Sequence, residues 1–249
     1  MECIYEKPTT LDPNGTSGFC PGCTFGTVVK LIAEVVEELD IRERTMLPMG
    51  VGCAVSARDW VDFDSMMSLH GRTSASGLGY KRVHPEGVTI ILQGDGDAVA
   101  IGMAESIHTA NRGEPVTVIL VNNQIYGRTG GQMAPTTLIG QNSTTSVNGK
   151  RVEDAGYPIH MAELIGTLKT PRFVARGTVH NVKEILKTKE LIKKAIRVQM
   201  EENAYSFVEV ITACTTNLGI PVSEVPDYIE NVVLQEFKPG VIKDESSIQ

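Results

Sequence analysis

The sequence predicts a three-layer α/β/α fold with a mainly parallel sheet. Two runs of β-branched and aliphatic residues, 88–92 and 116–121, are continuous rather than alternating, as in parallel strands that are covered on both faces. Apolar residues recur at helical spacing between them, over 98–110, so the three segments form a βαβ unit. A second strand–helix–strand series over 173–211 has the same order, which is typical of α/β proteins.

The segment before the first βαβ unit begins as an irregular arm. Residues 1–25 contain prolines and glycines that interrupt the chain too often for a helix or strand. Over 26–39, apolar residues at positions i, i+3, i+4 and i+7 predict one amphipathic helix. Residues 45–49 predict a short strand, which ends in the turn Gly50-Val51-Gly52-Cys53.

The second series contains the longest predicted helix. Strands are expected over 173–179 and 205–211, on either side of a helix over 181–202. Asn181 suits the N-cap of this helix, and Glu184 stands three residues later as its capping-box partner.

Two long segments outside these elements are predicted to be irregular. Residues 127–160 are rich in Gly, Thr, Ser and Asn, which favours a functional loop over a linker. Prolines indicate an extended C-terminal tail over 215–249. We expect a single domain over 1–249.

Composition and charge narrow the class of protein. The chain has 249 residues, of which 41% are hydrophobic and 21% charged, as in soluble globular proteins. Its formal net charge of −7 argues against a dedicated nucleic-acid binder. No apolar run approaches the roughly 18 residues of a membrane span, and the first residues lack the features of a secretory signal. We therefore expect a cytoplasmic protein with neither nucleic acid nor membrane as a partner.

Acidic and amide side chains follow two consecutive predicted strands. Gly94-Asp95-Gly96-Asp97 lies directly after one strand and before a helix, and Asn122-Asn123 follows the next strand. A helix N-terminus at the carboxyl end of a strand favours anions. Two carboxylates beside an anion require a cation, and Mg²⁺ takes oxygen ligands. The joint placement therefore predicts a site for a metal ion and a diphosphate.

Either motif alone would be read more simply as a tight turn with helix caps or as the start of a loop. A dinucleotide site of the Rossmann type fits poorly, because Val99 stands where the third glycine of G-x-G-x-x-G is required.

The cysteines form one C-x-x-C pair and two distant single residues: Cys20, Cys23, Cys53 and Cys214. Spacing alone leaves zinc, an iron–sulfur cluster, or a buried inert Cys214 as alternatives. Cys3 has no matching role and is expected to be a free thiol.

These motifs together resemble a known family. Gly94-Asp95-Gly96 followed by Asn122-Asn123 is similar to the thiamine-diphosphate motif. With Tyr126-Gly127-Arg128-Thr129-Gly130-Gly131-Gln132 and Cys20-Pro-Gly-Cys23, the chain resembles the β subunit of 2-oxoacid:ferredoxin oxidoreductases over nearly its whole length. The resemblance implies a thiamine-diphosphate-binding fold that serves as the diphosphate-binding module. Two positions differ from the family pattern: Ala54 replaces a frequent serine, and Thr215 replaces a frequent proline.

The resemblance also implies the cofactor-binding residues. Mg²⁺ would be held by Asp95, Asn123 and the carbonyl of Ile125. A 4Fe-4S cluster would be held by Cys20, Cys23, Cys53 and Cys214. Thiamine diphosphate would contact Val51, Gly52, Cys53, Ala54, His70, Gly96, Asp97, Gly127 and Arg128.

The implied reaction is the oxidative decarboxylation of a 2-oxoacid with coenzyme A to acyl-CoA and CO₂, with electrons passing through the cluster to ferredoxin. No glutamate here is identifiable as the activating one, so the resemblance implies that an α subunit with a pyrimidine-binding domain supplies it. γ and ferredoxin-like δ subunits are also implied. The expected substrate is 2-oxoisovalerate or 2-oxoglutarate. Arg128 would attract a distal carboxylate, or else face the diphosphate or solvent.

Two other functions compete with this one. The same Asp95 and Asn123 site would serve a non-redox thiamine-diphosphate-dependent decarboxylase subunit. The cysteines alone would serve an interaction module held together by zinc.

Overall fold

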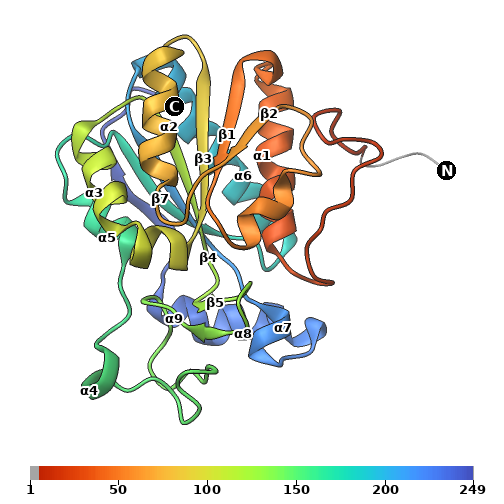
Figure 1. Cartoon of the computed structure of the whole chain (residues 1–249), viewed down its shortest axis with the longest axis vertical. Coiled ribbons are helices and arrows are strands. Elements are labelled where there is room, and N and C mark those ends of the chain that lie inside the picture. The colour runs from red at the N-terminus through yellow and green to blue at the C-terminus, as the bar shows by residue number, and fades with distance from the viewer. Residues whose placement is uncertain (1–5, 249) are drawn as a thin grey trace.

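The computed structural model describes residues 6–248 around a sheet of seven strands in the order β2-β1-β3-β4-β8-β7-β9 (Figure 1). Neighbouring strands run parallel, except that β9 pairs antiparallel with β7. The strands are β1 (Thr45–Met49), β2 (Asp64–Met67), β3 (Val88–Gly94), β4 (Thr117–Asn122), β7 (Phe173–Thr178), β8 (Ser206–Ile211) and β9 (Gly240–Asp244).

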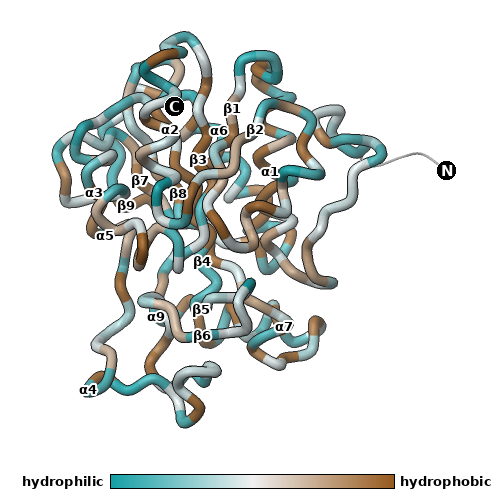
Figure 2. Tube along the Cα trace, in the orientation of Figure 1, coloured by the Kyte–Doolittle hydropathy of each residue, from teal (hydrophilic) through white to brown (hydrophobic). Residues whose placement is uncertain are grey.

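Helices cover both faces of this sheet. The longer helices are α1 (Phe25–Glu38), α2 (Thr73–Val83), α3 (Met103–Arg112), α5 (Met161–Gly166) and α6 (Val182–Glu202). Ile90 and Leu92 of β3 belong to the hydrophobic cluster under α1 and α6, whereas Ile91 belongs to the cluster with α3 and α5. α2 also contacts β3. The central strands are among the most hydrophobic parts of the trace (Figure 2), and the predicted three-layer fold is confirmed.

The predicted helices and strands occur with small shifts at their ends. The expected helix over 98–110 is divided, because Gly96–Ile101 forms a π-helix and α3 begins only at Met103. Asn181 caps α6 by accepting a hydrogen bond from the Glu184 N–H (3.0 Å). The Glu184 carboxylate accepts a bond from Lys187 (2.6 Å) instead of completing the capping box.

The segment over 54–87, for which no element was predicted, contains β2 and α2. The register of β2 against β1 pairs Met46 with Asp64 and Met49 with Met67. On α2, Gly77 faces β3 so closely that a Cβ there would lie 2.7 Å from the Ile91 side chain. The helix therefore packs through a glycine, which an apolar periodicity does not reveal.

The prediction of an extended C-terminal tail is wrong. Short helices occupy much of 215–236, and β9 then joins the sheet. They are α7 (Thr215–Leu218), α8 (Val225–Tyr228), a π-helix (Ile229–Val233) and α9 (Leu234–Glu236). Pro226 lies in the first turn of α8, where a missing N–H is tolerated. Pro221 and Pro226 therefore mark helix starts rather than an irregular chain.

These short helices form a layer beyond the carboxyl end of β4, together with part of the predicted loop 127–160 (Figure 1). The layer includes β5 (Ile125–Tyr126) and β6 (Gln132–Met133), whereas α4 (Val152–Ala155) lies apart from it on the extended loop (Figure 1). Its own apolar cluster contains Leu138, Ile211, Val225, Ile229, Val233 and Phe237. No helix within residues 6–248 is both long and apolar enough to cross a membrane. Cys3 lies outside the described residues.

Candidate functional site

The segments that follow β1, β3 and β4 enclose a cavity of about 90 Å³ at one edge of the sheet. In the sheet, β1 lies between β2 and β3, so the strand order reverses at β1. Open α/β sheets bind ligands at the carboxyl ends of the strands where the strand order reverses. The predicted site residues at this cavity are Val51, Gly52, Cys53, His70, Asp95, Gly96, Asp97, Asn123, Ile125, Gly127 and Arg128. Ala54 is not among the lining residues, because it is buried in the hydrophobic core.

Asp95 follows β3 directly, and its carboxylate is buried at the cavity. One oxygen accepts a hydrogen bond from the Gly96 N–H (2.8 Å), and the other accepts one from the Thr136 hydroxyl (2.6 Å). Burial raises the pKa of Asp95 to about 6, against the opposing effect of these bonds and of the Gln124 N–H. A bound cation would stabilise the charged carboxylate in this position.

Asp97 lies at the same cavity, but donors of this chain surround its carboxylate. Oδ1 accepts hydrogen bonds from the Gly71 N–H (2.7 Å) and from His70 Nδ1 (2.5 Å). Oδ2 accepts bonds from Gln93 Nε2 (2.6 Å) and from the Thr73 hydroxyl (3.2 Å). Asp97 therefore orients His70 and the start of α2.

The turn over 122–125 is held in a conformation that its residues would not adopt freely. Gln124 has φ 60°, in the left-handed region that disfavours residues other than glycine. Asn122 Oδ1 accepts bonds from the Gln124 N–H (3.1 Å) and Nε2 (3.0 Å), and the Thr137 hydroxyl donates to the Gln124 carbonyl (2.6 Å). Asn123 Oδ1 accepts a bond from the Ile125 N–H (3.3 Å). Polar contacts on both sides of the turn thus fix its shape.

The four cysteines Cys20, Cys23, Cys53 and Cys214 line a second cavity, of about 310 Å³. All four are free thiols. In the part of the chain that the structure describes, no group of three or more His, Cys, Asp or Glu side chains is close enough to hold a single metal ion. The sulfur atoms are therefore spread around a cavity.

Burial dominates the protonation of two of these thiols, Cys53 and Cys23. It raises the pKa of Cys53 to about 11, with further increases from the neighbouring cysteines. It also raises the pKa of Cys23. Both thiols are thus protonated near neutral pH without a metal, and metal binding would release protons.

The two cavities adjoin. Both are lined by Cys53, Asn123, Gly127 and Arg128. A Cβ atom at Gly127 would lie 3.3 Å from Cys214 Sγ, 3.5 Å from Asn123 Nδ2 and 3.6 Å from Cys53 Sγ. Arg128 donates a hydrogen bond to the Ser56 hydroxyl (3.2 Å). Gly127 therefore lies between two of the thiols and the Asn123 amide, with no space for a larger side chain.

Comparison with known proteins identifies the family. Residues 50–210 match the family "Thiamine pyrophosphate enzyme, C-terminal TPP binding domain". The 2-oxoglutarate synthase subunit KorB of Archaeoglobus fulgidus is 33% identical over 237 residues, which cover 91% of this chain and 84% of that protein. The chain belongs to the 2-oxoacid:ferredoxin oxidoreductase β-subunit family.

Other members and a solved structure extend this comparison. The ketoisovalerate oxidoreductase subunit VorA of Methanothermobacter marburgensis is 40% identical over 244 residues, which cover 98% of this chain and 51% of that protein. The chain thus spans about half the length of this relative. The structure of 2-oxoglutarate:ferredoxin oxidoreductase from Magnetococcus marinus with 2-oxoglutarate, coenzyme A and succinyl-CoA bound shares the fold, with a TM-score of 0.78 and 22% identity. That likeness covers 98% of this chain and 87% of the other.

Several polar residues at the site of this family member were not predicted from the sequence. Thr136 contacts Asp95, Thr137 contacts Gln124, and Gln93 contacts Asp97. The polar composition of 127–160 signalled a functional loop, but nothing in the spacing showed that its threonines reach the residues after β3 and β4. Such pairings depend on how the loop folds back, which the sequence pattern does not encode.

Among the glycines of this site, Gly96 has the least space for a side chain, and its replacement tests the geometry. A Cβ at position 96 would lie 2.2 Å from Tyr126 Cε1. We expect Gly96→Ala to displace Tyr126 and to lower the free energy of unfolding by about 1–3 kcal/mol, measured by urea denaturation. The control is Gly79→Ala, where no atom lies within 4 Å of the new Cβ. A loss no greater in Gly96→Ala than in this control would contradict the geometry.

Proposed function

We propose that this chain is the β subunit of an enzyme that oxidatively decarboxylates a 2-oxoacid with coenzyme A, giving acyl-CoA and CO₂ and passing electrons to ferredoxin. The observation that carries the proposal is that the cavity at Asp95 and Asn123 adjoins the cavity of the four cysteines. A short path between them suits one-electron transfer from an organic cofactor to an iron–sulfur cluster.

The chemistry of the donors at the first cavity fits Mg²⁺ and a diphosphate. The proposed ligands are the Asp95 carboxylate, the Asn123 amide oxygen and the Ile125 carbonyl, which are oxygen donors of the kind that Mg²⁺ takes. The buried Asp95, whose pKa is raised, gains from a neighbouring cation. Bound thiamine diphosphate would supply the carbanion stabilisation that decarboxylation needs.

The other lining residues have proposed roles that depend on their contacts. Val51, Gly52, His70, Gly96, Gly127 and Arg128 would contact the cofactor. Asp97 would hold His70, because its carboxylate accepts four hydrogen bonds within the chain. Ala54 would support the turn at Cys53 from the core rather than touch the cofactor.

The second cavity fits a 4Fe-4S cluster. Cys20, Cys23, Cys53 and Cys214 would be its ligands, since such clusters are held by four thiolates. The cluster would supply one-electron transfer. Its positive iron ions would lower the pKa of the Cys23 and Cys53 thiols, which burial raises without them. Residues 1–25 would then be the cluster-binding arm of a single thiamine-diphosphate-binding domain.

The size of the first cavity supports a site completed by a partner. Its volume of about 90 Å³ is below the roughly 300–1,000 Å³ of ligand pockets. Val51, Leu69 and Ile101 are 37%, 79% and 44% exposed at or near its rim, where a partner would cover them. We propose an α subunit with a pyrimidine-binding domain there, together with γ and ferredoxin-like δ subunits in a cytoplasmic complex.

The proposed substrate is 2-oxoisovalerate or 2-oxoglutarate, the two substrate classes in the names of the relatives. Arg128 lines both cavities and is the candidate for contacting a distal carboxylate.

An anaerobic assay of the assembled complex tests the proposal. The purified complex should be brown, with about four irons per copy of this chain in addition to those of any ferredoxin-like subunit. It should reduce ferredoxin only when Mg²⁺, thiamine diphosphate, coenzyme A and a 2-oxoacid are all present. Comparing rates on the two 2-oxoacids identifies the substrate. A colourless protein with stoichiometric zinc would contradict the proposal, and CO₂ release without ferredoxin reduction would favour the non-redox decarboxylase.

A further inference from the structure

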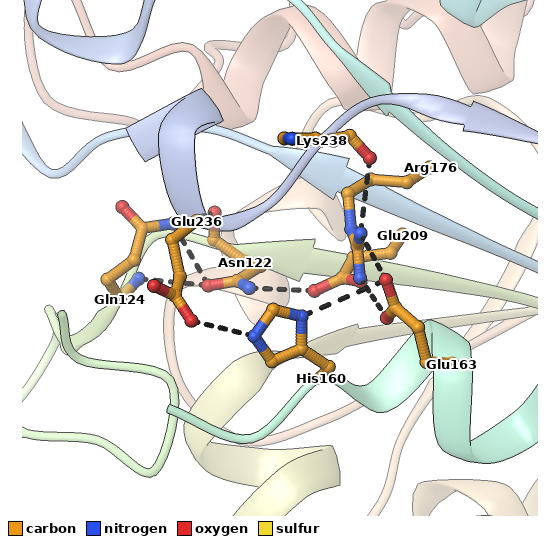
Figure 3. Close-up of polar contacts among 8 residues, drawn as sticks. All are labelled: Asn122, Gln124, His160, Glu163, Arg176, Glu209, Glu236 and Lys238. Atoms are coloured by element: carbon orange, nitrogen blue, oxygen red, sulfur yellow. Dashed lines mark hydrogen bonds and ion pairs between the residues drawn. The ribbon is translucent and has the colours of Figure 1, made fainter. Parts of the chain in front are cut away.

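A buried chain of hydrogen bonds runs across the sheet to the turn over 122–125 (Figure 3). Arg176 Nε donates to Glu209 Oε2 (2.8 Å), and Asn122 Nδ2 donates to Glu209 Oε1 (2.7 Å). Asn122 Oδ1 in turn accepts both bonds from Gln124. These hydrogen bonds thus link β7, β8 and β4 to the segment that contains Asn123 and Ile125.

Strand register brings these side chains together. Arg176 and Glu209 are directly opposed on β7 and β8. Glu209 is opposed on its other side by Leu120 of β4, and Asn122 lies two residues further along that strand on the same face. The bonds therefore follow from the parallel sheet and need no loop rearrangement.

Burial gives this series of hydrogen bonds a high desolvation cost, which a purely structural role does not explain. Arg176 is 1% exposed, and Glu209, Asn122 and Gln124 are fully buried. A buried ion pair is often no more stabilising than apolar residues of similar volume. The pair is better explained by an orienting role, because it dictates which way a neighbouring amide points.

The Glu209 carboxylate dictates that direction. An ionised carboxylate only accepts hydrogen bonds, so the NH₂ group of Asn122 must face Glu209 and its oxygen must face Gln124. That oxygen holds Gln124 at φ 60°. The backbone on either side of Gln124 carries Asn123 and the Ile125 carbonyl.

We propose that Glu209, oriented by Arg176, is a positioning residue for the cation-binding turn, which it acts on through the Asn122 amide. The identity of the cation as Mg²⁺ rests on the proposed function, whereas the control of the turn's shape does not.

The end of the hydrogen-bond series farthest from the turn offers a matched control. Glu163 also pairs with Arg176 (Oε1 to Nη1, 2.8 Å), but its side chain is 45% exposed, and its Oε1 lies 3.8 Å from His160 Nδ1. The Lys238 carbonyl accepts a further bond from Arg176 (3.2 Å), and His160 pairs with Glu236 (2.8 Å). Glu163→Gln therefore makes the same chemical change on the same arginine without altering the contact to Asn122.

The amide logic predicts both a defect and its rescue. In Glu209→Gln, the amide oxygen of the new side chain must face Arg176, which only donates hydrogen bonds. The new NH₂ group then faces the NH₂ group of Asn122, so two donors meet. If Asn122 turns over, its NH₂ group meets the Gln124 N–H instead. Adding Asn122→Asp restores an acceptor toward both neighbours and returns the lost negative charge.

Two measurements on the assembled complex test the proposal. The first is the Mg²⁺ dissociation constant at saturating thiamine diphosphate, by calorimetry. The second is hydrogen exchange over residues 120–126 without any ligand. We expect Glu209→Gln to raise the dissociation constant about tenfold or more and to speed exchange at Gln124. Glu163→Gln should change the constant less than about twofold, and Glu209→Gln/Asn122→Asp should restore it to within about threefold.

The outcomes separate this inference from the proposed function. If the assembled complex with the unchanged chain binds no Mg²⁺, the proposed function fails, and the exchange data still decide whether Glu209 controls the turn. Equal effects of Glu209→Gln and Glu163→Gln on exchange would overturn the inference. If Glu209→Gln does not fold, the double variant decides the matter, because it must fold and show wild-type exchange over 120–126.

Discussion

Replacing Asp95 with asparagine is expected to abolish Mg²⁺-dependent thiamine diphosphate binding while making the ligand-free chain more stable. Burial raises the pKa of Asp95 to about 6, above the roughly 3.9 of an unfolded chain. The folded chain therefore holds this proton more tightly, and stability falls as the pH rises from about 4 to about 6. Above pH 6 the ionised carboxylate costs about 3 kcal/mol, which Asp95→Asn removes.

The gain in stability should depend on pH. Urea denaturation with a chelator present should show a stabilisation of about 3 kcal/mol at pH 7.5 that shrinks toward zero near pH 4. Calorimetry at pH 7.5 should show no Mg²⁺-dependent binding of thiamine diphosphate. If the variant keeps wild-type Mg²⁺ affinity, the proposed metal site at Asp95 is wrong.

Asp97→Asn provides the matched comparison, because the same change is made two residues away. The Asp97 carboxylate accepts four hydrogen bonds, and an amide NH₂ group would face two of these donors. We expect a loss of stability of about 1–3 kcal/mol, opposite in sign to the effect at Asp95. These nearby carboxylates would thus differ because burial still raises the pKa of Asp95 despite its hydrogen bonds, whereas the four donors around Asp97 require an acceptor at both of its oxygens.

The parts of this site that could be predicted are those attached to strand ends. Asp95 and Asn123 directly follow β3 and β4, and adjacent parallel strands end at the same edge of a sheet. Their proximity therefore follows from two apolar runs in the sequence. The cofactor contact predicted at Ala54 illustrates the limit, since one residue beyond Cys53 the side chain turns into the core.

The parts that could not be predicted depend on small residues and on folded loops. Gly77 lets α2 approach β3 closely, so this helix lacks the apolar stripe by which α1 was recognised. Thr136 reaches Asp95 across 41 residues of sequence, and Glu209 reaches Asn122 across 87. Both contacts require the strand order and the path of the loop, which are set by tertiary packing.

Replacing Cys214 with serine is expected to separate the two proposed cofactors. Cys214 lines the cysteine cavity but not the cavity at Asp95, and it is buried, with its sulfur accepting a bond from Asn217 Nδ2 (3.3 Å). Loss of one thiolate should remove most of the roughly four irons per chain and lower ferredoxin reduction about a hundredfold. Mg²⁺-dependent binding of thiamine diphosphate should change less than about threefold, because its proposed ligands are intact.

Iron analysis, visible absorbance and calorimetry on the anaerobically purified complex measure these effects together. Cys3→Ser makes the same chemical change at a cysteine without a proposed role and should leave iron content and ferredoxin reduction unchanged. Full iron content in Cys214→Ser would contradict the proposed ligand set. Loss of both cofactors in a folded protein would mean that the two cavities form one site. Loss of iron alone would mean that the two cofactors occupy separate sites, as expected if Cys214 lines only the cysteine cavity.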